Sequence, residues 1–156
     1  MFVALACVAG SLLTIGDLWD ATSTQAVDPR PPGIFARPRR PTVILFQVGL
    51  SCRHCFEQLE TLTAKLPLND INLVVVIPEG PPVDAQVRRF TGVQFVSDLH
   101  GRWAKNYGLA QSARDALNLH ATVILAADRR VIWKVAGEEP YMDPAEIKRQ
   151  LANVAE

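Results

Sequence analysis

The sequence predicts an α/β fold in which helices cover a β-sheet. Three runs are continuously apolar and rich in β-branched residues: residues 42–48 (TVILFQV), 73–77 (LVVVI) and 122–126 (TVILA). Uninterrupted apolar runs of this length are typical of strands that are buried on both faces. Between the first two runs, apolar residues recur at helical spacing, as expected of a helix that packs on the sheet.

Length and composition restrict the class of protein. The chain has 156 residues, of which 49% are hydrophobic and 21% are charged, as in one globular domain with a short appendage. Sixteen basic and sixteen acidic residues cancel, so no excess of positive charge favours nucleic acid as a partner. Three cysteines are too few for a disulfide-stabilised miniprotein. Two of them form a C-x-x-C pair, the most informative feature of the chain.

The first helix is predicted over residues 52–66 and ends before Pro67, because the residue before a proline disfavours the helical conformation. Its apolar face consists of Phe56, Leu59, Leu62 and Leu66. A short second helix is predicted to end near Gly92, and its apolar face consists of Val83, Val87 and Phe90. Residues 93–96 are predicted to form another short strand.

The following segment is predicted to contain a helix and a hairpin. Residues 101–107 are expected to be helical and to end at Gly108. Asp98 is expected to cap or turn this segment. Residues 127–130 are predicted to be the turn that joins the third apolar run to a further strand at residues 131–135.

The last element is predicted to be a helix with a well-defined start. Asp143 is expected to be its N-cap and Pro144 its first residue, and Glu146 is expected to complete a capping box. Ile147 and Leu151 should then face the core.

Residues 1–41 are predicted to lie outside the domain, which we place at residues 42–156. Residues 2–15 are largely apolar; they fall short of the about 20 residues that span a membrane but have the length of a signal-peptide core. Residues 28–41 hold five prolines and four arginines, as expected of a linker. An apolar run of this length followed by a linker favours an exported or membrane-tethered protein. The alternative is that the run forms a buried strand or hairpin that leads into the domain.

The C-x-x-C pair lies where a buried strand passes into a helix. Cys52, at the helix N-terminus, is expected to meet free N–H groups and the positive end of the helix dipole, which stabilise a thiolate. Arg53 and His54 add positive charge beside it. Cys55, three residues further along the helix, is close enough to resolve a mixed disulfide. These residues predict a redox-active pair, with Cys52 and Cys55 as catalytic residues.

Two other interpretations of the same thiols stay open. They could be half of a zinc site, or two inert buried thiols. A zinc site normally has four ligands, and the chain has no second C-x-x-C. Cys7 lies 45 positions upstream of Cys52, whereas His100 or His120 could be recruited.

Three segments resemble those of a known family: FQVGLSCRHC, VSDLHGRWAKNYGL and HATVILAADRRVIWKVAGE. In their order and spacing, residues 42–151 resemble the thioredoxin-like superfamily, specifically the redoxin group with alkyl hydroperoxide reductase-like and thiol-specific antioxidant-like domains. The resemblance implies a thioredoxin-like α/β fold, a central mixed sheet flanked by helices in three α/β/α layers. It also implies a thiol–disulfide oxidoreductase that acts on protein thiols or disulfides and requires no metal or organic cofactor.

The resemblance allows two chemistries. Cys55 falls where peroxiredoxins keep the cysteine that attacks peroxide, but Cys52 replaces their threonine or serine. Val48 replaces their loop proline, and His120 replaces an expected arginine, so a thiol peroxidase fits less well. In the thioredoxin-type alternative His120 is implied to lie beside the active-site loop, and Ala121 replaces the cis-proline that faces it. The His120–Ala121 peptide bond should be trans, because a cis bond before a non-proline residue costs about 2.5–4 kcal/mol.

A second resemblance concerns the segment GLSCRHCFEQLETL alone. It is similar to the metal-binding loop of heavy-metal-associated domains, in which both thiolates bind a soft ion such as Cu(I). The first strand of those domains is half exposed and should alternate, whereas residues 42–48 do not. A Cu(I) chaperone is therefore the alternative from the class of binding proteins, beside the peroxidase.

Overall fold

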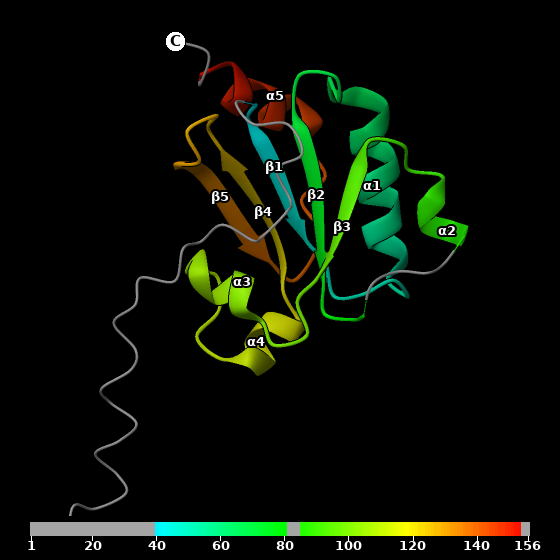
Figure 1. Ribbon diagram of the computed structural model, residues 1–156, viewed down its shortest axis with the longest axis vertical. Helices are drawn as coiled ribbons and strands as arrows, with labels where there is room; N and C mark the ends of the chain where they lie inside the picture. The colour runs from blue at the N-terminus through cyan, green and yellow to red at the C-terminus, as the bar shows by residue number, and fades with distance from the viewer. Residues whose placement is uncertain (1–39, 81–84, 154–156) are drawn as a thin grey trace, which may run out of the picture.

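The computed structural model describes residues 40–80 and 85–153, which form a five-stranded sheet packed between helices (Figure 1). The strands are β1 (Thr42–Phe46), β2 (Asn72–Ile77), β3 (Val93–Ser97), β4 (His120–Leu125) and β5 (Val131–Gly137). The helices are α1 (Arg53–Lys65), α2 (Ala85–Arg88), α3 (Arg102–Asn106), α4 (Ala113–Leu117) and α5 (Pro144–Ala152). The predictions for residues 1–39 and for Val83 lie outside the described residues.

The sheet is mixed and has the strand order β3–β2–β1–β4–β5. The central strand β1 pairs in parallel with β2 and antiparallel with β4. The outer pairs are β2 with β3, in parallel, and β4 with β5, antiparallel. Because β1, β2 and β3 run in the same direction, their carboxyl ends meet at one edge of the sheet. In α/β sheets this edge is where ligand-binding and catalytic loops gather.

Two apolar clusters lie on opposite faces of the sheet, as the three layers in Figure 1 indicate. Side chains of β1 alternate between them: Val43 and Leu45 join the cluster under α1 and α5, and Ile44 and Phe46 join the one under α3 and α4. All five residues of β1 are buried. The continuous apolar runs were therefore correctly predicted to be strands covered on both faces.

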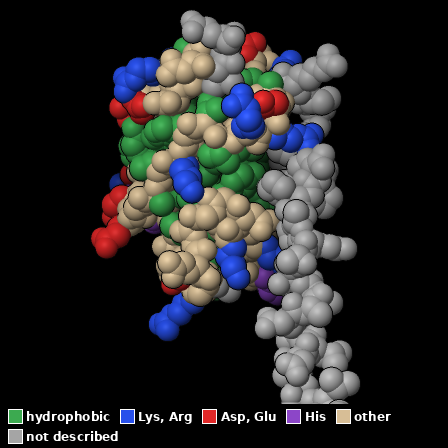
Figure 2. Space-filling view, turned by 90° about the vertical axis from the view of Figure 1, so that its left-hand side faces the viewer, with side chains coloured by type: hydrophobic (Ala, Val, Ile, Leu, Met, Phe, Trp, Pro, Cys, Tyr) green, Lys and Arg blue, Asp and Glu red, His purple; other side chains and the backbone are tan. Residues whose placement is uncertain are grey.

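Strand β5 forms one edge of the sheet and is only partly buried. Figure 2 shows the side of the molecule on which β5 lies, and hydrophobic side chains gather in the middle of this face. Val131, at the start of the strand, is 46% exposed. An edge strand has one neighbour, so partial exposure is expected of it.

No helix among the described residues has the length and apolar character that a membrane crossing requires.

Helix α4 is not predicted by the sequence. It is one turn long, and Ser112 and Asp115 cap it reciprocally. The Ser112 hydroxyl accepts from the Asp115 N–H at 3.1 Å, and the Asp115 carboxylate accepts from the Ser112 N–H at 3.1 Å. The small side chain of Ala116 packs against the apolar cluster on the sheet, whereas Leu117 is 37% exposed, so no apolar periodicity marks the helix.

Helix α5 begins as predicted, but the predicted capping box is wrong. The Asp143 carboxylate accepts from the N–H groups of Ala145 at 2.9 Å and Glu146 at 3.1 Å. The Glu146 carboxylate does not return a bond to Asp143; it accepts from Gln150 at 2.7 Å and pairs with Arg149. The carboxylate oxygens of Glu146 therefore contact residues one turn further along the helix, and not the N-cap.

Asp98 holds the turn between β3 and α3, as predicted. Its carboxylate accepts from the N–H groups of Arg102 at 2.9 Å and Trp103 at 3.0 Å. These N–H groups lie in the first turn of α3 and have no partner within the helix. The helix in turn places Tyr107 against Phe46 on the sheet, with the ring centroids 6.0 Å apart in an edge-on contact.

Asp98→Ala should lower the free energy of unfolding by about 1 kcal/mol, because two N–H groups of α3 lose their acceptor. Urea denaturation followed by circular dichroism measures the change. Asp98→Asn keeps one acceptor oxygen and should lose less. An equal loss in both variants would contradict capping as the cause.

Candidate active site

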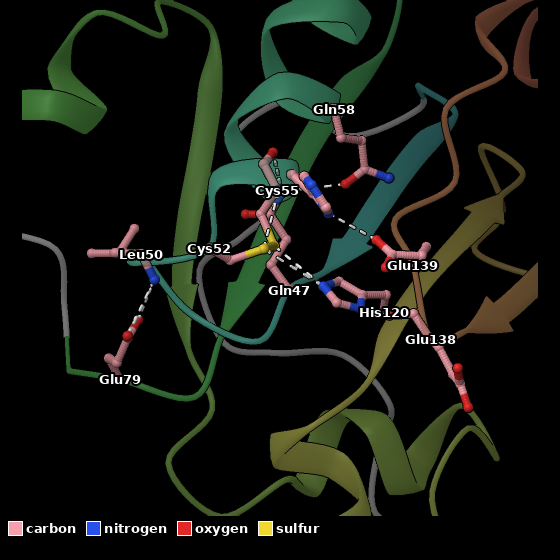
Figure 3. The surroundings of a disulfide bond; sticks show 10 residues. Gln47, Leu50, Cys52, Cys55, Gln58, Glu79, His120, Glu138 and Glu139 are labelled. Carbon is pink, nitrogen blue, oxygen red and sulfur yellow. Dashed lines mark hydrogen bonds and ion pairs between the residues drawn. A yellow bond between two sulfur atoms is a disulfide. The ribbon is translucent and has the colours of Figure 1, made fainter.

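The C-x-x-C pair lies at the edge of the sheet where the parallel strands end (Figure 3). Cys52 is the N-cap of α1, and its Sγ atom accepts from the Cys55 N–H at 3.1 Å. The two cysteines form a disulfide bond. Cys52 is partly exposed, whereas Cys55 is 1% exposed. The pair therefore joins one partly exposed cysteine to one buried cysteine.

His120 lies beside both sulfur atoms, in the position that the resemblance implies. Its Nε2 atom is 3.4 Å from the Sγ atom of Cys55 and 3.7 Å from that of Cys52. Its Nδ1 atom is 2.7 Å from the carbonyl oxygen of Glu138. A carbonyl oxygen only accepts, so Nδ1 carries the hydrogen in this contact. In the neutral ring, the Nε2 lone pair then faces the sulfurs.

Ala121 is an ordinary residue of β4. It pairs with Phe46 of β1 and with Ala136 of β5, and it is buried. The described residues contain no cis peptide bond, so the His120–Ala121 bond is trans, as predicted. Strand β4 thus begins at His120, and the His120 side chain lies in the site.

Arg53 and His54 both lie on the exposed surface of the first turn of α1, and each faces a carboxylate. Arg53 Nε donates to Glu57 at 2.9 Å. His54 Nδ1 is 2.9 Å from an oxygen of Glu139, in the loop between β5 and α5. The carboxylates oppose the positive charge that these residues were expected to bring to Cys52. His54 instead links α1 to the neighbouring loop.

Two buried glutamines next to the pair are not predicted by the sequence. Gln47, which follows β1, donates from Nε2 to the carbonyl of Cys55 at 3.0 Å and to Gln58 Oε1 at 3.3 Å. Gln58 donates to the carbonyl of Tyr141 at 2.9 Å. The chain of bonds ties β1, α1 and the β5–α5 loop together. For Gln47, the available signal was an amide side chain inside the apolar run at residues 42–48.

Glu79 is a further unpredicted residue, and it holds the loop before Cys52. Its two carboxylate oxygens lie 2.9 and 3.1 Å from the N–H of Leu50 (Figure 3). The contact needs Gly49, whose φ is +144°. A Cβ atom at position 49 would lie 2.5 Å from Glu79 Oε1. The signal in the sequence was an acidic residue two positions after the end of a buried parallel strand.

A groove of about 510 Å³ adjoins the site. His120, Ala121 and residues 135–142 line it, so it extends from the start of β4 along the end of β5 and the loop that follows. Met142, on its wall, is 44% exposed. The groove thus adjoins the pair through His120, whose Nε2 atom lies 3.4 Å from the Sγ atom of Cys55.

One group of potential metal ligands occurs among residues 40–80 and 85–153. It consists of Cys52, Cys55 and His120, whose ligand atoms all lie within 4.8 Å of one another. His100 is exposed and does not belong to it. Cys7 lies outside the described residues.

A mixed sheet between helices, with a C-x-x-C disulfide at the start of the first helix, defines a thioredoxin-like fold. Comparison with solved structures confirms this prediction. The chain is 18% identical to a secreted Mycobacterium tuberculosis disulfide oxidoreductase homologous to Escherichia coli DsbE, with a TM-score of 0.51 over 73% of this chain and 81% of that one. Neither a protein-family model nor a curated protein sequence matches the present chain significantly.

Two other solved structures have the same fold. Peroxidoxin BcpB from Mycobacterium tuberculosis is 22% identical, with a TM-score of 0.54 over 74% of this chain and 78% of that one. A thioredoxin-like protein from Aeropyrum pernix is 14% identical, with a TM-score of 0.53 over 78% of this chain and 81% of that one. At these identities the likeness establishes the fold and not the activity.

Gly49→Ala should lower the free energy of unfolding by about 1–3 kcal/mol, because an L-residue is strained at this φ and its Cβ atom displaces Glu79. Gly80→Ala is the matched control: a Cβ atom there meets nothing within 4 Å, so the change should stay within about 0.5 kcal/mol. Thermal and urea unfolding measure both variants. Equal effects of the two substitutions would contradict the role given to the Gly49–Glu79 contact.

Proposed function

We propose that the protein is a thiol–disulfide oxidoreductase that exchanges disulfides with protein thiols or disulfides through Cys52 and Cys55. One observation carries the proposal: a disulfide at the start of α1 joins a partly exposed cysteine to a buried one. The fold shared with a solved disulfide oxidoreductase supports it.

Cys52 is the nucleophile in this proposal. As N-cap of α1 it accepts an N–H hydrogen bond from Cys55, and it lies at the positive end of the helix dipole. Both stabilise the thiolate, the reactive form of cysteine. Attack on a partner disulfide forms a mixed disulfide on Cys52 and releases one partner sulfur as a thiolate, which takes up a proton.

Cys55 completes the exchange. Its thiol loses a proton, and His120 Nε2, 3.4 Å away, is placed to accept it. The Cys55 thiolate then attacks the Cys52 sulfur and forms the intramolecular disulfide. The second partner sulfur leaves as a thiolate and takes up the proton that His120 accepted. Two electrons pass from the pair to the partner disulfide, and the reverse sequence oxidises a partner dithiol.

A thiol peroxidase is the second candidate, since a peroxidoxin has the same fold. The cysteine that would attack peroxide is Cys55, because it falls at the peroxiredoxin position. Cys55 is 1% exposed, and its disulfide partner Cys52 is the more exposed residue of the two. A buried sulfur favours the role of resolving thiol over that of a first nucleophile, so exchange ranks above peroxidation.

Serine variants of the two cysteines, made one at a time, should separate the attack step from the resolution step. Cys52→Ser should abolish exchange with a protein disulfide such as that of insulin, because no exposed nucleophile is left. Cys55→Ser should still attack but fail to resolve, so mixed disulfides should accumulate on Cys52. Non-reducing electrophoresis and peptide mass spectrometry detect the adducts, and the double variant is the control.

The opposite pattern would invert the assignment. Adducts on Cys55 in Cys52→Ser, with none in Cys55→Ser, would make Cys55 the nucleophile. Rapid peroxide turnover that requires Cys55 and not Cys52 would likewise make Cys55 the nucleophile, and it would favour the peroxidase.

We place the exchange outside the cytoplasm or at a membrane. The apolar residues 2–15 and the fold shared with a secreted oxidoreductase support this location. A fusion of residues 1–41 to alkaline phosphatase, which is active only after export, should show activity that a fusion without residues 2–15 lacks. Equal activity of both fusions would refute the location.

A further inference from the structure

The two sulfur atoms and the Nε2 atom of His120 are three potential ligand atoms that lie within 4.8 Å of one another. The Nε2 atom lies 3.4 and 3.7 Å from the two Sγ atoms. An ion with bonds of about 2.3 Å to sulfur and 2.0–2.1 Å to nitrogen, at angles of 110–120°, separates those atoms by about 3.6–3.8 Å. The backbone thus already holds Nε2 near the distance from each sulfur that a shared ion requires. The two sulfurs are joined in the disulfide and separate when the pair is reduced.

The orientation of His120 is also that of a metal ligand. Histidines that bind metal typically donate their second ring N–H to a carboxylate or a backbone carbonyl, which fixes the ring and directs the lone pair to the ion. His120 makes this contact to the carbonyl of Glu138 at 2.7 Å. His120 is 9% exposed and Cys55 is 1% exposed, so two of the three ligand residues are shielded from water.

We propose that the reduced protein binds one Cu(I) ion through Cys52 Sγ, Cys55 Sγ and His120 Nε2. Thiolate ligands select soft ions such as Cu(I), and imidazole suits copper as well. Zinc prefers a tetrahedral set of four ligands, whereas the described residues supply three here. The site goes beyond disulfide exchange and does not depend on it.

Binding and disulfide formation exclude one another, because the same two sulfurs are used. When Cu(I) binds, the two thiols release two protons to solvent and the complex carries one net negative charge. In the disulfide form neither sulfur is a thiolate, so the oxidised protein should not bind. A ligand of the reduced form alone raises the reduction potential of the pair, by about 30 mV for each tenfold of free Cu(I) above its dissociation constant.

Anaerobic titration of the reduced, metal-free full chain with Cu(I), in competition with the chelator bicinchoninate, tests the site. We expect one Cu(I) per chain, no binding by the disulfide form, and at least about 10-fold weaker binding by His120→Ala. His100→Ala is the matched control and should bind as the wild type does, because His100 is exposed and away from the sulfurs.

X-ray absorption at the copper edge of the wild-type complex is independent of whether the variant folds. It should show two sulfur ligands and one nitrogen ligand. A spectrum with sulfur alone, or equal Cu(I) affinity in a folded His120→Ala variant, would overturn the proposal. Retention of Zn(II) in place of Cu(I) would overturn it as well.

An exchange assay on the metal-free protein separates this proposal from the preceding one. A protein that exchanges disulfides without binding Cu(I) refutes only the metal site. A protein that binds Cu(I) without exchange refutes only the oxidoreductase.

Discussion

The pairing of β1 with β4 is the constraint on which the site depends. These strands are distant in the chain, and their antiparallel register places Phe46 opposite Ala121. The loop with the cysteines therefore leaves the sheet beside the residue at which β4 begins. This brings His120 to two sulfur atoms that lie 68 and 65 positions earlier. A slip of one residue would turn the His120 side chain to the other face of the sheet.

Polar contacts then hold the start of α1 against this pairing from several sides. Gln47 binds the carbonyl of Cys55, and Glu79 binds the N–H of Leu50. The side-chain amides of Gln47 and Gln58 are both buried and both bonded. Buried polar groups that are fully satisfied rigidify the structure around them, because a displaced group would lose its partner where no water replaces it.

The sequence predicts the parts of this molecule that depend on local pattern. The runs at residues 42–48, 73–77 and 122–126 predict the central strands, and the C-x-x-C spacing predicts the pair at a helix N-terminus. The register that selects His120 was accessible only through a family resemblance. Contacts to backbone atoms, such as those of Glu138 and Tyr141, leave no trace in side-chain identity, and α4 is too short to show periodicity. The Glu139 carboxylate opposite His54 depends on loop geometry in the same way, whereas Glu57 lies one helical turn after Arg53 on α1.

One such backbone contact affects how this protein can diverge. The ring of His120 is oriented by the main-chain oxygen of Glu138 and not by its side chain. Every amino acid supplies that oxygen, so substitutions at position 138 leave the orientation of the ring intact. The exposed side chains of Glu138 and Glu139 border the groove. Evolution can therefore alter the charge that a partner meets at this rim, and with it the choice of partner, while the chemistry at the sulfur atoms is inherited unchanged.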